Sequence, residues 1–188
     1  LVELFSNQIA RIDGYKIRFL RINKNVYLQN KIELDNKYNF LNIDNGNDNI
    51  IKLLFKDIKS NFNKNTNVLS LKSVGDNSKV FIKNSSLNNI KIYVDSCLTI
   101  DNSYLNKVQI FSNVKNQNCK NAVHFVNSSG NLDKIENSSY EFGDNLDFDL
   151  SNIIVKNIKI ESSSNDCLGV KDGNYEFIKV NLYDCKDK

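Results

Sequence analysis

The residues with the clearest chemical potential are two aspartates, Asp147 and Asp149, which alternate with Leu146, Phe148 and Leu150. Successive side chains of an extended strand point to opposite faces. The alternation therefore predicts two outward carboxylates, with the three apolar side chains in the core. Carboxylates held together on a surface can serve as general acid and base, or can bind a cation.

A third carboxylate, Asp166, follows Asp147 at an offset of 19 along the chain. If the chain coils with a period near that spacing, the two side chains become neighbours on the outer surface. Neighbouring carboxylates repel, which raises the pKa of one of them and suits it to general-acid catalysis. We therefore predict Asp147 and Asp166 as catalytic residues. The alternative is a solvated acidic face whose aspartates end strands.

Other polar residues of the same stretch are positioned to contact a substrate. We assign this role to Asp144, Asp149, Asn165, Lys171 and Asp172. We predict no cofactor and assign no dedicated metal ligands, although the aspartates could chelate a hard cation such as Ca²⁺. The sequence has no CxxC motif and no Cys/His cluster, so it does not indicate a zinc site.

An internal repeat must position these residues. Residues 80–92 match residues 98–110 at an offset of 18, and residues 158–160 match residues 180–182 at an offset of 22. The first offset aligns Ile82 with Ile100, Asn84 with Asn102, Ser85 with Ser103, Leu87 with Leu105, Ile90 with Val108 and Ile92 with Ile110. Coils of this size cannot bury their own apolar face, so neighbouring coils must stack and share one core.

The pattern inside each repeat is apolar-x-apolar, then Asn, Ser or Asp, then apolar-x-apolar, which is typical of short strands joined by tight turns. The two offsets differ, so the period drifts, and this favours a β-helix, whose turns vary in length. We predict an all-β chain: one single-stranded right-handed parallel β-helix solenoid of about 8–9 coils over residues 1–188. Residues 50–62 could instead form a short helix, and a leucine-rich repeat is a weaker alternative.

Asparagine is abundant, at roughly one residue in six, and it suits the tight turns of such a fold. We expect the chain to be a fragment of a longer protein. Residues 1–24 would then be the remnant of an N-terminal cap, and the C-terminal end would be open.

The four cysteines are Cys97, Cys119, Cys167 and Cys185, and the spacings within the two pairs equal the two offsets of the repeat. Each pair could therefore lie in adjacent coils, either as a disulfide or as stacked reduced thiols, and we favour reduced thiols. The single histidine, His124, alternates with apolar residues, and we expect it on the surface or in a turn without a catalytic role.

The acidic stretch resembles the polygalacturonases of the pectin lyase-like superfamily. The resemblance lies in Asn-Leu-Asp-Phe-Asp-Leu at residues 145–150, the strand at 154–160, and Asn-Asp-Cys-Leu-Gly-Val at 165–170. It covers roughly a sixth of the chain. It implies a right-handed β-helix that cleaves polysaccharides, with Asp147 and Asp166 on positions of the family's catalytic acids.

The chain also departs from that family. Asn165 stands where the family has the aspartate that protonates the leaving group, and an amide cannot supply that proton. After Cys185, the chain reads Lys-Asp-Lys instead of the family's Gly-His-Gly motif. The acidic stretch also resembles non-catalytic β-helix modules of large bacterial surface proteins.

The composition argues against two classes of partner, nucleic acids and the membrane interior. The net charge is +3 and the charges are scattered singly, so we expect no nucleic-acid binding. No apolar run is long enough to span a membrane.

We predict an extracellular or cell-surface scaffold that contacts a polysaccharide or cell-surface glycan, aided by tyrosines such as Tyr93 and Tyr104. The alternative is a polysaccharide hydrolase or lyase.

Overall fold

The computed structural model describes residues 10–12, 15–22, 27–32, 38–44, 49–114, 119–138 and 143–187. These residues form strands and no helix, so the all-β prediction is confirmed. The strands are β1 (Ala10–Ile12), β2 (Tyr15–Ile22), β3 (Tyr27–Ile32), β4 (Asn39–Asp44), β5 (Ile50–Lys56), β6 (Ile58–Asn63), β7 (Val68–Ser73), β8 (Lys79–Lys83), β9 (Ser86–Asn88), β10 (Lys91–Val94), β11 (Cys97–Asp101), β12 (Tyr104–Ser112), β13 (Asn121–Val126), β14 (Ser129–Asn137), β15 (Asp144–Ile160), β16 (Ser163–Asp166), β17 (Leu168–Leu182) and β18 (Cys185–Asp187).

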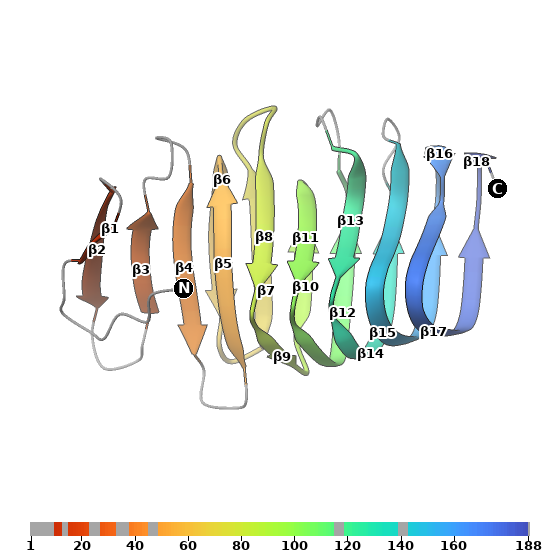
Figure 1. Ribbon diagram of the computed structural model, residues 1–188. Helices are drawn as coiled ribbons and strands as arrows, with labels where there is room; N and C mark the ends of the chain where they lie inside the picture. Colours follow the sequence, from red (N-terminus) through yellow and green to blue (C-terminus); the bar gives the residue numbers. More distant parts are fainter. Residues whose placement is uncertain are drawn as a thin grey trace.

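Stacked parallel strands build a β-solenoid of about five turns (Figure 1). One surface, called face A here, consists of β8, β11, β13 and the first parts of β15 and β17, all parallel. The opposite run, called face B, consists of β7, β10 and the last parts of β12, β14, β15 and β17. Each coil thus supplies one strand to each face.

The expected 8–9 coils were too many, because the N-terminal strands pair differently. Strands β1 to β5 form an antiparallel meander at one end of the stack, and β5 is antiparallel to β8 (Figure 1). Antiparallel and parallel strands share the same two-residue alternation, so the sequence pattern does not separate them. Strands β1 and β2 fall within residues 1–24, where a cap was expected; the rest of that stretch lies outside the described residues.

Residues 50–62 form β5 and β6, so the helical alternative for this stretch is wrong. In β5, buried Ile51, Leu53 and Phe55 alternate with less buried residues, which is the period of a strand. The described part of the chain contains no helix that could cross a membrane.

The core repeats from coil to coil as predicted. Ile82 and Ile100 are register partners, and both are completely buried. Phe125 and Phe148 continue the core toward the C-terminal coils, with stacked rings whose centroids are 4.9 Å apart. Identical or similar apolar side chains therefore lie one above another along the solenoid.

The corner after face A is a column of residues with positive φ: Asn84, Asn102, Asn127, Leu150 and Asp172. The Asn102 amide donates a hydrogen bond of 2.6 Å to Asn84 Oδ1, so asparagines stack here as the repeat predicts. Leu150 was expected in the core, but it is 57% exposed. Its place in the column explains the error, because the left-handed turn interrupts the alternation of the strand.

A ladder of buried serines follows this corner column. The backbone N–H groups of Ser85, Ser103 and Ser128 donate to the hydroxyl of the serine one coil further on, at 3.2, 3.3 and 3.0 Å. The last acceptor is Ser151, whose own N–H donates to the Tyr175 hydroxyl at 3.1 Å. The ladder satisfies backbone donors where the chain turns out of face A.

Candidate functional site

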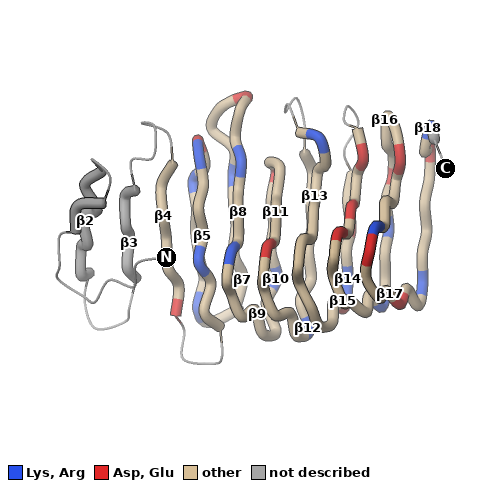
Figure 2. Tube along the Cα trace, in the orientation of Figure 1, with Lys and Arg blue, Asp and Glu red and all other residues tan. Residues whose placement is uncertain are grey.

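Acidic positions recur along β15 and the strands beside it (Figure 2). Asp147 and Asp149 point outward from face A, whereas Leu146 and Phe148 are buried, as the alternation predicts. Their side chains are 14% and 31% exposed, respectively. Asp147 is therefore an outward but largely covered carboxylate.

Asp166 does not lie opposite Asp147. The register partner of Asp147 is Gly169, because the two coils are offset by 22 at this point and not by 19. Asp166 lies in β16, where it pairs with Asp187 of β18 and its carbonyl oxygen accepts a 2.8 Å hydrogen bond from the Ser163 hydroxyl. The expected Asp147–Asp166 neighbour pair is therefore wrong.

Gly169 has a steric role beside Asp147. A Cβ atom at this position would lie 2.7 Å from Asp147 Oδ1, closer than Cβ contacts normally are. The missing side chain therefore leaves space for the carboxylate in the neighbouring coil. A larger residue would push that carboxylate out of its place.

The other predicted residues form two pairs and one corner position. The Asn165 amide donates a 2.7 Å hydrogen bond to Asp144 Oδ1. Lys171 is the register partner of Asp149, one coil further on. Asp172 belongs to the positive-φ corner, with φ of 43°. The Asn165 amide thus serves as a donor to a carboxylate.

His124 lies beside Asp147 and Asp149, although the sequence indicated no role for this histidine. It is the register partner of Asp147, and its Nε2 lies 3.0 Å from Asp149 Oδ2 and 3.8 Å from Asp147 Oδ2. The imidazole thus sits between the two carboxylates. Asn121 completes the group, since its amide donates a 2.8 Å hydrogen bond to Asp147 Oδ2.

The surroundings of Asp147 disfavour its charge. Burial raises the pKa of the Asp147 carboxyl above its ordinary value, and the neighbouring charge of Asp149 raises it further, with a smaller contribution from Asp144. His124 opposes these effects. The site therefore combines two carboxylates that repel each other with one imidazole nitrogen that lies within 3.8 Å of both.

A surface depression of about 210 Å³ adjoins this cluster on face A. Its lining includes an aromatic ring, two lysines and the disulfide between Cys97 and Cys119. The lining residues are Lys79, Val80, Phe81, Cys97, Thr99, Cys119, Lys120, Asn121 and His124. His124 and Asn121 thus face both the carboxylates and an accessible space.

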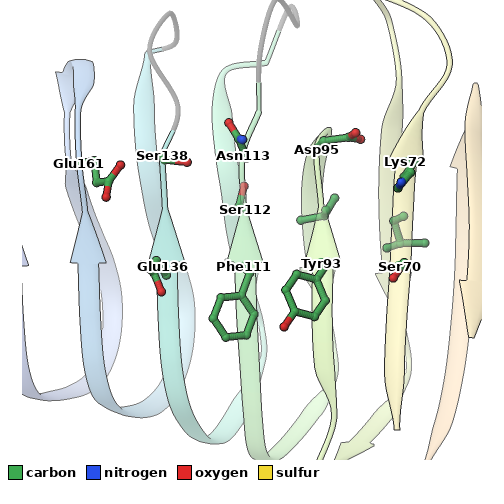
Figure 3. A pocket seen from close by; sticks show the side chains of 12 residues that line it. Ser70, Lys72, Tyr93, Asp95, Phe111, Ser112, Asn113, Glu136, Ser138 and Glu161 are labelled. Carbon is green, nitrogen blue, oxygen red and sulfur yellow. The ribbon is translucent and has the colours of Figure 1, made fainter. Parts of the chain in front are cut away.

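A larger groove of about 470 Å³ lies on face B (Figure 3). Its centre is an aromatic pair: Tyr93 and Phe111 are register partners on β10 and β12, with stacked rings whose centroids are 4.8 Å apart. Tyr93 is 44% exposed. Its register partner on the other side is Ser70, a small residue that also lines the groove. The groove therefore presents an exposed aromatic surface.

Polar side chains surround the aromatic pair, and Figure 3 shows them on successive strands. Asp95, Glu136 and Glu161 supply carboxylates along the groove, and Lys72 supplies a cation. The hydrogen bond from Lys134 lowers the pKa of Glu136, and the nearby charge of Lys159 adds to this effect. Glu136 therefore keeps its charge in mildly acidic solution.

The two features escaped the sequence analysis for different reasons. His124 and Asp147 are partners at an offset of 23, whereas Tyr93 and Phe111 are partners at an offset of only 18. The match of residues 80–92 with 98–110 already aligned the strands of the aromatic pair, and extending it by one position finds Phe111. No comparable signal linked His124 to the aspartates.

Both cysteine pairs form disulfides across adjacent coils, Cys97–Cys119 and Cys167–Cys185, with Cα–Cα distances of 5.8 and 5.5 Å. The predicted pairing is confirmed, and the preference for reduced thiols is wrong. Each disulfide links cysteines 22 or 18 positions apart, and therefore closes one coil onto the next.

Comparison with known proteins identifies no relative of this chain. No family model matches the chain, and neither a curated protein nor a solved structure is detectably similar to it.

Proposed function

We propose that this β-solenoid is a scaffold module that holds a neutral glycan chain in the groove of face B. The observation that carries the proposal is the stacked pair of Tyr93 and Phe111 at the centre of that groove. Sugar rings have apolar faces formed by C–H groups, and aromatic side chains provide a flat apolar surface with a polar tip for them.

The open face of Tyr93 is the stacking surface. Phe111 covers one face of its ring, and Lys134 Nζ lies 5.2 Å from the Phe111 ring centroid and covers the far end of the stack. The Tyr93 face on the side of Ser70 is therefore the surface on which we expect a sugar ring to stack. Burying about 50 Å² of ring surface contributes about 1.3 kcal/mol, which corresponds to roughly tenfold in affinity.

The charges of the groove favour a neutral sugar polymer over an acidic one. The carboxylates of Asp95, Glu136 and Glu161 can accept hydrogen bonds from sugar hydroxyls. Lys134 and Lys159 pair with Glu136 and Glu161, so the groove and its border carry no excess positive charge that would attract a uronic-acid polymer. Lys72 is the single cation among the lining residues of the described chain. This preference differs from the pectic substrate that the polygalacturonase resemblance implies.

The proposal is tested by binding of neutral and uronic-acid oligosaccharides, first on a glycan array and then by calorimetry. We expect Tyr93→Ala to weaken binding of a neutral oligosaccharide at least tenfold. Tyr104→Ala is the matched control, because Tyr104 is 54% exposed and does not line the groove. Retention of no neutral glycan at millimolar concentration would contradict the proposal, as would equal losses in the two variants.

The two disulfides support an extracellular or cell-surface location. Disulfides persist in oxidising compartments and are rare in the reducing cytosol. Cys97–Cys119 and Cys167–Cys185 both link stacked coils, and such links stabilise the folded state. Free-thiol titration of the protein isolated from its native source tests this location, since four reactive thiols would contradict it.

A polysaccharide-degrading enzyme is the second candidate, favoured by the convergence of His124, Asp147 and Asp149 on face A. Carboxylates and imidazoles are groups that can serve as general acid and base in such cleavage. Turnover of neutral, pectic and alginate polymers, compared with Asp147→Ala, tests this candidate. If all of these polymers stay intact, the enzyme is excluded and the binding module is unaffected.

A further inference from the structure

We propose that His124, Asp147 and Asp149 form a binding site for a divalent transition-metal ion of the Zn²⁺ type on face A. One imidazole nitrogen and two carboxylate oxygens, one atom from each residue, lie within 4.8 Å of one another. The site is separate from the groove of face B and does not depend on glycan binding there.

The distances between the three ligand atoms suit a single ion bound by all of them. Two ligand atoms bound at about 2.1 Å in tetrahedral geometry are about 3.4 Å apart. His124 Nε2 lies 3.0 Å from Asp149 Oδ2 and 3.8 Å from Asp147 Oδ2, on either side of that value. Small side-chain rotations are therefore sufficient to place all three atoms around one ion.

The backbone holds the ligands in this arrangement. His124 and Asp147 are paired in the register of β13 and β15, and Asp149 follows two positions later on the same side of the strand. Gly169 leaves the space that the Asp147 carboxylate occupies. Three ligands on rigid neighbouring strands lose little conformational freedom when an ion binds.

Asn121 provides the independent observation. It is only 7% exposed, its Nδ2 donates to Asp147 Oδ2 at 2.8 Å, and its buried Oδ1 has no hydrogen-bond partner. A buried acceptor without a partner is costly. A half-turn of the amide would exchange its oxygen and nitrogen and bring Oδ1 beside Asp147 Oδ2, where one cation can contact both oxygens in exchange for the hydrogen bond of Nδ2.

The donor set decides which ion is expected. Ca²⁺ prefers six to eight oxygen ligands, whereas imidazole favours zinc, copper, iron and nickel. The aspartates alone could chelate a hard cation such as Ca²⁺, but once His124 is included the ligands suit a Zn²⁺-type ion better. The imidazole and the two carboxylates fill three of four tetrahedral positions, and Asn121 Oδ1 or a water molecule can take the fourth.

His124 is the single histidine of the sequence, which makes the test direct. The untagged, EDTA-treated protein is titrated with ZnCl₂ alone and observed by long-range ¹H–¹⁵N NMR and calorimetry. We expect one equivalent of zinc to shift the ring-nitrogen resonances of this histidine and to bind with micromolar affinity. CaCl₂ is expected to bind at least tenfold more weakly than zinc.

The variants His124→Ala and Asp149→Asn are expected to weaken zinc binding at least tenfold. Asp101→Asn is the matched control, because Asp101 also points outward from face A but lies outside the cluster. Far-UV circular dichroism verifies that each variant is folded. The proposal is refuted if wild-type ring nitrogens do not respond to zinc, if Ca²⁺ binds more tightly, or if Asp149→Asn binds zinc as the wild type does.

Discussion

Replacing Ser151 by alanine tests the serine ladder at its most buried position. Ser151 is completely buried, and its hydroxyl makes two hydrogen bonds. It accepts from the backbone N–H of Ser128 at 3.0 Å and donates to the backbone oxygen of Asp149 at 2.8 Å. Ser128 is itself 1% exposed, so water cannot replace the lost acceptor without opening the coil.

The expected cost follows from that unsatisfied donor. Leaving one buried N–H group without a partner costs about 1–3 kcal/mol, whereas removing a single oxygen atom creates little cavity. We therefore expect Ser151→Ala to lower the free energy of unfolding by about 2 kcal/mol. For a chain of this size, that corresponds to a decrease in Tm of about 4–8 °C.

Urea and thermal unfolding, followed by circular dichroism, measure the effect. Asn152→Ala is the control, because Asn152 is the exposed neighbour and its Oδ1 accepts only an exposed hydrogen bond from Asn174. The control is expected to change the free energy of unfolding by less than about 0.5 kcal/mol. Equal effects of the two substitutions would show that the ladder does not stabilise the corner.

Three further predictions concern other parts of the solenoid. Gly130 has φ of +118°, and a Cβ there would lie against the Leu105 carbonyl oxygen, so Gly130→Ala is expected to destabilise the protein by about 3 kcal/mol or more in urea unfolding. Removing the Cys97–Cys119 disulfide, whose cysteines are 22 positions apart, is expected to cost about 3 kcal/mol; an unchanged Tm after double substitution to alanine would contradict this. Because the pKa of Glu136 is lowered from 4.5 in the folded state, its charge stabilises the protein above that pH, and the stabilisation is lost as the pH falls through the folded-state pKa. Wild type and Glu136→Gln should therefore become equally stable in strong acid, and a difference that persists there would contradict the reasoning.

Repeated residue types allowed much of the fold to be predicted. Ile82 stacks on Ile100 and Asn84 on Asn102 because strands one coil apart contact each other directly, so similar residues recur at the spacing of the coil. The cysteine spacings carried the same information, and the predicted pairs are the observed ones. The tertiary structure showed that both pairs lie within the Cα–Cα range of a disulfide bond.

The candidate sites depended on turn lengths that a sequence pattern does not contain. An offset of 19 to the following coil would have placed Asp166 beside Asp147, but the actual offset of 22 places Gly169 there. The offset from the preceding coil is 23, and it places His124 on the other side of Asp147. Each turn residue added or removed changes the sequence offset at which residues of adjacent coils become partners.

By itself, the sequence determined that this protein consists of short strands with an alternating apolar face that must stack to be buried. Alternation over two residues follows from strand geometry and is local. Only the tertiary structure decided that the strands before β6 run antiparallel, that His124 lies between two carboxylates, and that Tyr93 covers Phe111. These facts concern which side chains meet across coils, and that depends on the summed lengths of all intervening turns.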